Sequence, residues 1–209
     1  MRTKTEVARL LLQSKAIKIE PTNHFTWASG WKSPIYCDNR KTLSFPEVRS
    51  IIRDEFVELI EKEFEKPAVI AGVATGAIAQ AALVADAMDL PMVYIRSSAK
   101  SHGLENLIEG LIETGQKVIV VEDLISTGGS SLKAVNALRN AGAEVLGMVA
   151  IFTYGFNVAS ENFDSYKCKL YTLSNYESLL KAALEDGSIN DSHLEILEKW
   201  RRNPENWKK

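Results

Sequence analysis

An apolar run at residues 118–121 is followed at once by two carboxylates, Glu122 and Asp123. A short apolar run rich in β-branched residues is typical of a buried parallel strand, so we expect both acids at its carboxyl end. Open α/β sheets bind their ligands at that edge. A Ser/Thr/Gly loop then leads into a helical pattern, and its N–H groups and hydroxyls suit an anion. The segment therefore combines acceptors for sugar hydroxyls with a phosphate cradle, as a phosphorylated ribose requires.

The segment 118–130 resembles the phosphoribosyl diphosphate signature of type I phosphoribosyltransferases, in which two acids flanked by apolar residues precede a Thr-Gly-Gly-Ser loop. The resemblance implies that the acids hold the ribose hydroxyls and that the loop holds the 5′-phosphate. The residues it assigns to phosphoribosyl diphosphate here are Glu122, Asp123, Leu124, Ile125, Ser126, Thr127, Gly128, Gly129 and Ser130. The alternative is an ordinary strand-to-helix turn with capping hydroxyls and solvated acids.

Three cations, Arg96, Lys100 and His102, lie at the start of a polar stretch at residues 97–114. This stretch is longer than a usual connection, which favours a functional loop, and its cations could neutralise a departing diphosphate. Ordinary surface charge is the alternative. The stretch resembles the catalytic loop of orotate phosphoribosyltransferases. That resemblance implies that Lys100 is the catalytic loop cation, acting together with Glu122 and Asp123, and that Arg96, Lys100 and His102 contact the diphosphate.

Residues 25–40 resemble the Ser-Gly-x-x-Ser-Pro-x-Tyr hood segment that separates orotate enzymes from purine phosphoribosyltransferases. The rings of Phe25, Trp27 and Tyr36 could enclose a flat base or could form a small aromatic core. Some relatives carry a lysine directly before Ser-Gly. Because Ala28 stands there in this chain, the phosphate contact that this lysine makes in those relatives is absent here or is made by another group such as Lys32.

Two further positions depart from the family pattern. At the turn 72–77, where backbone amides hold diphosphate in the family, some members have Lys-Gly and this chain has Thr75-Gly76. The backbone role survives that change, and simple helix capping is the alternative. Some relatives bind the orotate carboxylate through an arginine near position 154, but this chain has none between Arg139 and Arg201. We therefore expect Ser126 and loop amides to bind orotate.

Strands and helices alternate along the chain, which predicts βαβ units. Strands are expected at residues 68–74, 91–96, 117–122, 144–152 and 166–173, whereas 25–40 is expected to be irregular. Helices are expected at 3–14, after 44, at 76–89, at 129–140, before 184 and near the end. Four capping boxes are expected, at Thr3/Glu6, Ser44/Glu47, Ser174/Glu177 and Ser192/Glu195. The prediction is an α/β fold of the type I phosphoribosyltransferase kind, with a mainly parallel central sheet and helices on both faces. It forms a single domain, 1–209, in which residues 1–45 contribute a small hood over the base site.

Composition excludes several other classes. The chain has 209 residues, 45% of them apolar, and a formal charge of −2, so nothing favours nucleic-acid binding. Two cysteines form neither a disulfide framework nor a metal motif and fit a reducing cytoplasm. No signal peptide, membrane span or P-loop motif is present in the sequence, so we expect a cytoplasmic protein with no membrane partner.

The resemblance implies a pentosyltransferase that joins orotate to phosphoribosyl diphosphate in de novo pyrimidine (UMP) biosynthesis, releasing diphosphate and orotidine 5′-monophosphate. Mg²⁺ would be the cofactor, bound mainly to the substrate diphosphate, so no protein ligand is assigned to it. The resemblance also implies a homodimer in which the loop 97–114 reaches the neighbouring site. Two alternatives stay open: a phosphoribosyltransferase for another base, and a non-catalytic sensor of phosphoribosyl diphosphate.

Overall fold

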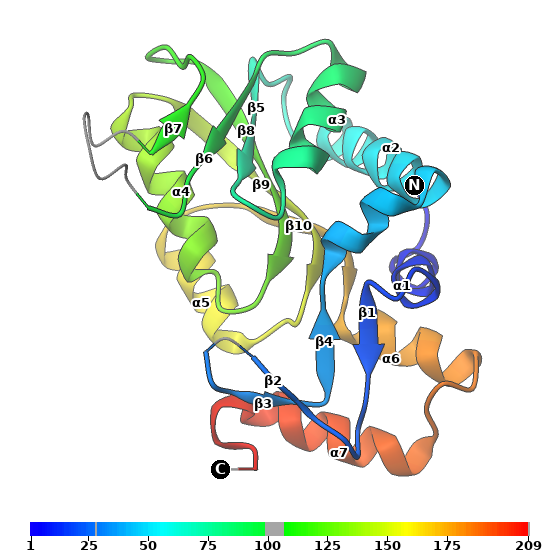
Figure 1. Cartoon of the computed structure of the whole chain (residues 1–209). Helices are drawn as coiled ribbons and strands as arrows, with labels where there is room; N and C mark the ends of the chain where they lie inside the picture. The colour runs from blue at the N-terminus through cyan, green and yellow to red at the C-terminus, as the bar shows by residue number, and fades with distance from the viewer. Residues whose placement is uncertain (28, 99–106, 209) are drawn as a thin grey trace.

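The computed structural model describes residues 1–27, 29–98 and 107–208, and its centre is a twisted sheet (Figure 1). Among these residues, six strands form the sheet in the order β10-β9-β8-β5-β6-β7. Neighbouring strands are parallel except for β7, which is antiparallel to β6. The strands are β5 (Val69–Val73), β6 (Met92–Ile95), β7 (Ile108–Glu109), β8 (Lys117–Ile125), β9 (Glu144–Thr153) and β10 (Leu170–Asn175). The predicted fold class is thus confirmed.

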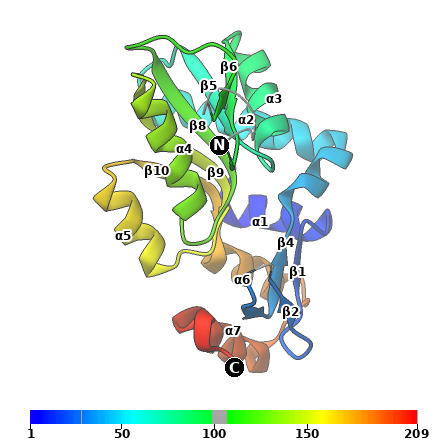
Figure 2. The same ribbon diagram turned by 60° about the vertical axis from the view of Figure 1, so that its left-hand side comes forward.

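Helices cover both faces of this sheet (Figure 2). The helices are α1 (Lys4–Gln13), α2 (Pro46–Glu63), α3 (Ile78–Met88), α4 (Gly129–Asn140), α5 (Asn157–Ser165), α6 (Tyr176–Glu185) and α7 (Asp191–Arg202), with short 3-10 turns η1 (Asn39–Ser44) and η2 (Pro204–Asn206). None of the described helices has the length and apolar character needed to cross a membrane.

The central strands are buried on both sides because their alternate residues enter two different cores. On β8, Ile119 and Val121 pack with α1, α2, α3 and α6. Val118 and Val120 point the other way and pack with α4 and α5. A strand covered on both faces needs no polar alternation, which explains the continuous apolar run in the sequence.

Two small antiparallel sheets lie apart from the main sheet, close to α7 (Figure 1). One pairs β1 (Ile17–Ile19) with β4 (Ile35–Cys37), and the other pairs β2 (Phe25–Thr26) with β3 (Lys32–Ser33). The prediction that 25–40 is irregular was therefore wrong. The error arose because strands of two or three residues are too short to show a hydrophobic period.

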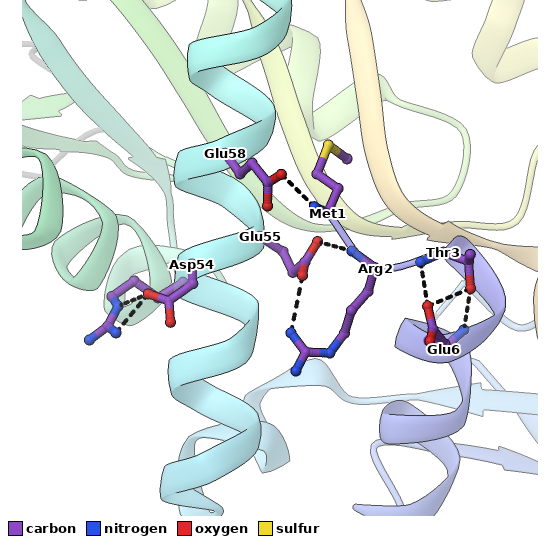
Figure 3. A network of polar contacts seen from close by, with 8 residues as sticks. Met1, Arg2, Thr3, Glu6, Asp54, Glu55 and Glu58 are labelled. Atoms are coloured by element: carbon purple, nitrogen blue, oxygen red, sulfur yellow. Dashed lines mark hydrogen bonds and ion pairs between the residues drawn. The ribbon is translucent and has the colours of Figure 1, made fainter.

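The first residues of the chain tie α1 to α2, as Figure 3 shows. Arg2 donates its backbone N–H to Oε2 of the buried Glu55 at 2.8 Å and its Nη1 to Oε1 at 3.1 Å. The amino group of Met1 pairs with Glu58. Thr3 and Glu6 form the predicted capping box. These contacts anchor the helix that leads into β1.

The other three predicted capping boxes were wrong. Helix α2 begins at Pro46, and proline keeps the preceding residue extended, so Ser44 lies one residue too early to cap. Ser174 is buried in β10, where its hydroxyl donates to Lys4 O at 2.7 Å. Asparagines at positions 175 and 190 cap α6 and α7 instead of Ser174 and Ser192.

Four other differences from the prediction concern α5, β10, β8 and β7. Helix α5 was missed because its short sequence buries only two side chains, Ala159 and Phe163. As a result, the last strand was placed at 166–173, whereas β10 spans Leu170–Asn175. Strand β8 runs past the two acids to Ile125, and the polar stretch contains the short strand β7.

Candidate active site

The two acids of the motif lie side by side on β8 in different surroundings. Glu122 keeps only 5% of its accessible surface. Its Oε2 accepts from Ser131 Oγ at 2.8 Å and its Oε1 accepts from the Asp123 N–H at 2.9 Å. Burial, and then the neighbouring Asp123 carboxylate, raise the pKa of Glu122 well above its usual range. Asp123 is only half-buried, so the two carboxyl groups are not equivalent.

Both acids border a cavity of about 440 Å³, which we call the acid cavity. Three separate parts of the chain form its wall: the end of β4 and start of η1, the turn after β5, and β8 with the loop to α4. The lining residues are Cys37, Asp38, Arg40, Val73, Ala74, Thr75, Gly76, Glu122, Asp123, Leu124, Ser126, Thr127, Gly128, Gly129, Ser130 and Ser131. The cavity thus brings together nearly all the residues predicted from the phosphoribosyl diphosphate motif. Ile125 is the exception, because its side chain is fully buried in the core beneath α4.

The loop at residues 126–130, here called the phosphate loop, leads from β8 into the N-terminus of α4. Gly128 has φ +81°, and a Cβ there would lie 2.8 Å from the Phe163 ring, so the position requires glycine. Asn162 on α5 donates to Thr127 O at 2.9 Å and supports the loop from behind. No described side chain caps α4, so its first N–H groups are available to an anion in the cavity.

The turn after β5 packs directly against the second acid. A Cβ at Gly76 would lie 2.6 Å from Asp123 Oδ1, which is closer than any side chain tolerates. A larger residue at this position would therefore displace the Asp123 carboxylate. Thr75 and Gly76 line the acid cavity.

The opposite wall contains residues to which sequence reasoning gave no role. Asn39 is buried, and its Nδ2 donates to the Asp123 carbonyl at 2.6 Å. Arg40 Nε donates to Asp38 Oδ1 at 2.6 Å, and this bond lowers the pKa of Asp38. Burial raises the pKa of the Cys37 thiol. Their position directly after the hood motif was the signal that could have pointed to them.

Arg96 lies at the end of β6, beside a second cavity of about 480 Å³. Its Nη1 is 3.5 Å from Glu109 Oε1. Ala74 and Thr75 line both this cavity and the acid cavity, so Arg96 faces the other side of the turn after β5. Lys100 and His102 lie outside the described residues, as does Ala28.

The aromatic residues of the hood do not act as one group. Trp27 packs into a cluster of rings, with ring centroids 5.0 Å from Tyr154 and 5.8 Å from Trp200, and its Nε1 donates to Ile35 O at 3.0 Å. Phe25 and Tyr36 pair with each other at 5.6 Å. Trp27 therefore belongs to an aromatic core, the alternative left open by the sequence. Lys32 donates to Thr26 Oγ1 at 2.9 Å and borders a third cavity, away from the phosphate loop.

Known proteins share both this sequence and this fold. The model of the phosphoribosyl transferase domain family matches residues 43–180. An orotate phosphoribosyltransferase of Porphyromonas gingivalis is 57% identical over 201 residues, covering 96% of this chain and 96% of that protein.

Two solved structures are similar. The orotate phosphoribosyltransferase of Aeropyrum pernix has a TM-score of 0.76 and 26% identity, covering 88% of this chain and 99% of that one. That of Mycobacterium tuberculosis, in complex with 5-phospho-α-D-ribosyl 1-diphosphate, has a TM-score of 0.65 and 26% identity, covering 84% and 98%. The acids and the phosphate loop line one cavity together with residues directly after the hood motif, and the sequence relationship extends over nearly the full length, so the chain belongs to the orotate phosphoribosyltransferase family.

Proposed function

We propose that this protein transfers the 5-phosphoribosyl group from phosphoribosyl diphosphate to N1 of orotate in pyrimidine biosynthesis. The products are orotidine 5′-monophosphate and diphosphate. One observation carries the proposal: a single cavity joins two adjacent acids to an uncapped helix N-terminus. These are the groups that a ribose bearing a 5′-phosphate requires.

In this proposal the acids and the phosphate loop hold the ribose from its two ends. Asp123 borders the cavity and accepts hydrogen bonds from the ribose 2′- and 3′-hydroxyls together with Glu122. Residues 126–130 bind the 5′-phosphate through backbone N–H groups and hydroxyls. As the bond to diphosphate breaks, C1′ gains positive charge, and the Asp123 carboxylate stabilises it electrostatically. Positioning and charge stabilisation suffice, without a covalent intermediate.

The diphosphate leaves toward the turn after β5. Backbone amides of Thr75 and Gly76 contact it, Arg96 contributes charge from the adjoining cavity, and the family pattern adds Lys100 and His102. Lys100 is the proposed catalytic cation of the loop.

Mg²⁺ bound to the substrate diphosphate would neutralise charge on the leaving group. The site suits an ion held in that way. The half-buried Asp123 carboxylate beside the phosphate loop offers one oxygen ligand, and Mg²⁺ usually takes one or two carboxylates plus substrate phosphates and water.

Ser126 is the proposed contact to orotate, because it lines the acid cavity between the acids and the rest of the phosphate loop. Residues 1–45 are the proposed hood, since the end of β4 and the start of η1 complete the cavity wall. A cytoplasmic location stays a prediction.

A spectrophotometric assay tests the activity. Orotate absorbance should fall only when phosphoribosyl diphosphate and Mg²⁺ are both present. Faster turnover with a purine base or uracil would favour a phosphoribosyltransferase for another base. Binding of phosphoribosyl diphosphate by folded protein without turnover of any base would favour a non-catalytic sensor.

A homodimer that shares its sites is the proposed assembly, in which the loop 97–114 acts on the neighbour's substrate. Its support is the family resemblance. Mixing the Lys100→Ala and Asp123→Asn variants tests it, because a mixed dimer contains one site with both residues intact. Random exchange makes about half of the dimers mixed, so activity should return to about a quarter of wild type. No recovery after proven exchange would show that Lys100 acts within its own subunit or that it is not catalytic.

A further inference from the structure

The substrate named in the proposed function carries a carboxylate, and a carboxylate taken out of water needs a charged or multiply hydrogen-bonding partner. The acid cavity is lined by three acidic side chains, Asp38, Glu122 and Asp123, and by one arginine, Arg40. The guanidinium of Arg40 is bonded to Asp38 at 2.6 Å, and its side chain is 58% exposed. Arg40 is therefore already paired with an acid on its own wall.

A larger cavity of about 820 Å³, here called the α7 cavity, adjoins the phosphate loop. Helix α7 and the end of the chain, which contribute to its lining, lie at the bottom of Figure 1. It is lined by Trp31, Thr127, Gly155, Phe156, Asn157, Val158, Glu198, Arg201, Arg202, Asn203, Pro204 and Glu205. Thr127 borders both this cavity and the acid cavity, so the two spaces meet at the phosphate loop. A flat base attached to a ribose in the acid cavity can therefore extend past Thr127 into the α7 cavity, toward Trp31 and the turn after β9.

Arg201 is held in place at this junction. Its Nη2 donates to Gly155 O at 3.3 Å, and its guanidinium carbon lies 5.2 Å from the centre of the Tyr176 ring. Gly155 has φ +65°, and a Cβ there would lie 2.9 Å from Nη2, so the absence of a side chain lets the guanidinium reach the turn. Glu177 pairs with Arg201 at 3.3 Å, but its side chain is 74% exposed. It therefore competes only weakly with a ligand carboxylate for the Arg201 guanidinium.

The neighbouring arginine lacks these restraints. Arg202 is 80% exposed and its described ion pair is with Glu198 on the same helix, at 3.4 Å. The side chain of Arg201 is only 32% exposed. A partly buried guanidinium whose orientation is already set loses less entropy when it binds a carboxylate, and its fork matches the two oxygens.

We propose that Arg201 binds the carboxylate of orotate from α7, while the pyrimidine ring packs on the edge-to-face pair formed by Trp31 and Phe156, whose ring centroids are 6.5 Å apart. The inference rests on the proposed function and names the residue that recognises the group distinguishing orotate from uracil. Ser126 keeps its proposed contact to the ring. The C-terminal helix would thereby determine base specificity, although it lies far in sequence from the phosphoribosyl diphosphate motif.

The test compares two nucleotides that differ only in this carboxylate. Affinities of orotidine 5′-monophosphate and uridine 5′-monophosphate are measured by calorimetry on wild type and on Arg201→Gln. Wild type should prefer orotidine 5′-monophosphate by about ten- to a hundred-fold, the contribution of a charge-assisted bond. Arg201→Gln should lose most of that preference while its affinity for uridine 5′-monophosphate stays unchanged. Lys199→Gln removes an exposed charge from the same helix and should keep the full preference.

Four outcomes would overturn the inference. The first is an unchanged preference for orotidine 5′-monophosphate in Arg201→Gln. The second is an equal loss of affinity for both nucleotides in that variant, which would indicate a structural role for Arg201. The third is loss of preference in Arg202→Gln or Arg40→Gln but not in Arg201→Gln. The fourth is a wild type that turns over orotate but binds both nucleotides equally.

If Arg201→Gln does not fold, Arg201→Lys replaces it. Because lysine keeps the charge but lacks the guanidinium fork, this variant should show an intermediate preference for orotidine 5′-monophosphate. A full preference would contradict the proposal. A wild type that neither turns over orotate nor binds either nucleotide would instead refute the proposed function.

Discussion

The acid cavity and the α7 cavity meet at Thr127 but are assembled in different ways. Most of the acid cavity comes from one continuous segment, β8 with the loop into α4. The α7 cavity joins the hood, the turn after β9 and the last helix, which are more than a hundred residues apart in places. The first depends on local backbone geometry, whereas the second depends on packing between distant elements.

This difference separates the two tasks of the proposed reaction. Binding a phosphate and a ribose requires groups at short, fixed spacing, and a strand–loop–helix unit provides them locally. Recognition of a base requires a surface shaped by tertiary contacts. The five variants below test this contrast, in order of decreasing expected effect.

Replacing Trp200 should have the largest effect, because it holds α7 against the hood. This ring is fully buried, contacts Trp27 and Tyr154, and donates Nε1 to Lys32 O at 3.1 Å. Trp200→Ala should lower the free energy of unfolding by about 3–5 kcal/mol in a denaturant titration. The exposed neighbour Lys199 provides the control, and Lys199→Ala should change the free energy of unfolding by less than about 0.5 kcal/mol. A loss below about 1 kcal/mol for Trp200→Ala would mean that α7 is not held by this cluster.

Asp123→Asn should affect activity far more than stability, because its carboxylate borders the cavity. A charge-assisted hydrogen bond contributes about 1.5–3 kcal/mol, so kcat/KM should fall about ten- to a hundred-fold. Melting should change little. Asp54→Asn on the surface of α2 is the matched control. Early melting, with full activity in the folded fraction, would make Asp123 a structural residue.

Asn39 joins the start of η1, after the hood, to the second acid of β8 through its 2.6 Å bond to the Asp123 carbonyl. Asn39→Ala leaves that carbonyl without this donor, which should cost about 1–3 kcal/mol of stability and lower kcat/KM about tenfold. Both are measured on the same sample, with Asn140→Ala at the exposed end of α4 as control. Wild-type activity despite the loss of stability would show that the hood does not position the acid.

Glu122→Gln should make stability depend less on pH. Because burial raises the pKa of Glu122, the folded state keeps a proton that the unfolded chain releases, and wild type loses stability as pH rises from about 4 toward 7. Each unit of elevation costs about 1.4 kcal/mol at a pH above the raised value. The variant should therefore be the more stable protein at neutral pH, with the difference shrinking toward about pH 4. A difference independent of pH would refute this account.

Ser126→Ala should have the smallest effect. Losing one neutral hydrogen bond costs about 0.5–1.5 kcal/mol, so the KM for orotate should rise about two- to ten-fold. The KM for phosphoribosyl diphosphate should stay within about twofold. A change confined to phosphoribosyl diphosphate would place Ser126 in the phosphate cradle alone.

How much of the structure the sequence could predict depended on how far apart the interacting residues lie along the chain. The fold class, the strand at β8 and the helix at 129–140 follow from apolar runs and glycine positions, and the structure confirmed them. Three of four capping boxes failed, because a Ser-x-x-Glu spacing does not show whether Pro46 or a nearby asparagine starts the helix.

By itself, the sequence determined the central sheet, the phosphate loop and the family to which the chain belongs. Only the tertiary structure brought Asn39 to the Asp123 backbone, placed Trp27 in an aromatic core and brought Arg201 to Gly155. The physical reason is that backbone conformation at the motif follows from neighbouring residues, whereas these contacts join segments whose separation carries no local pattern. They form only when the hood and α7 pack against the end of the sheet.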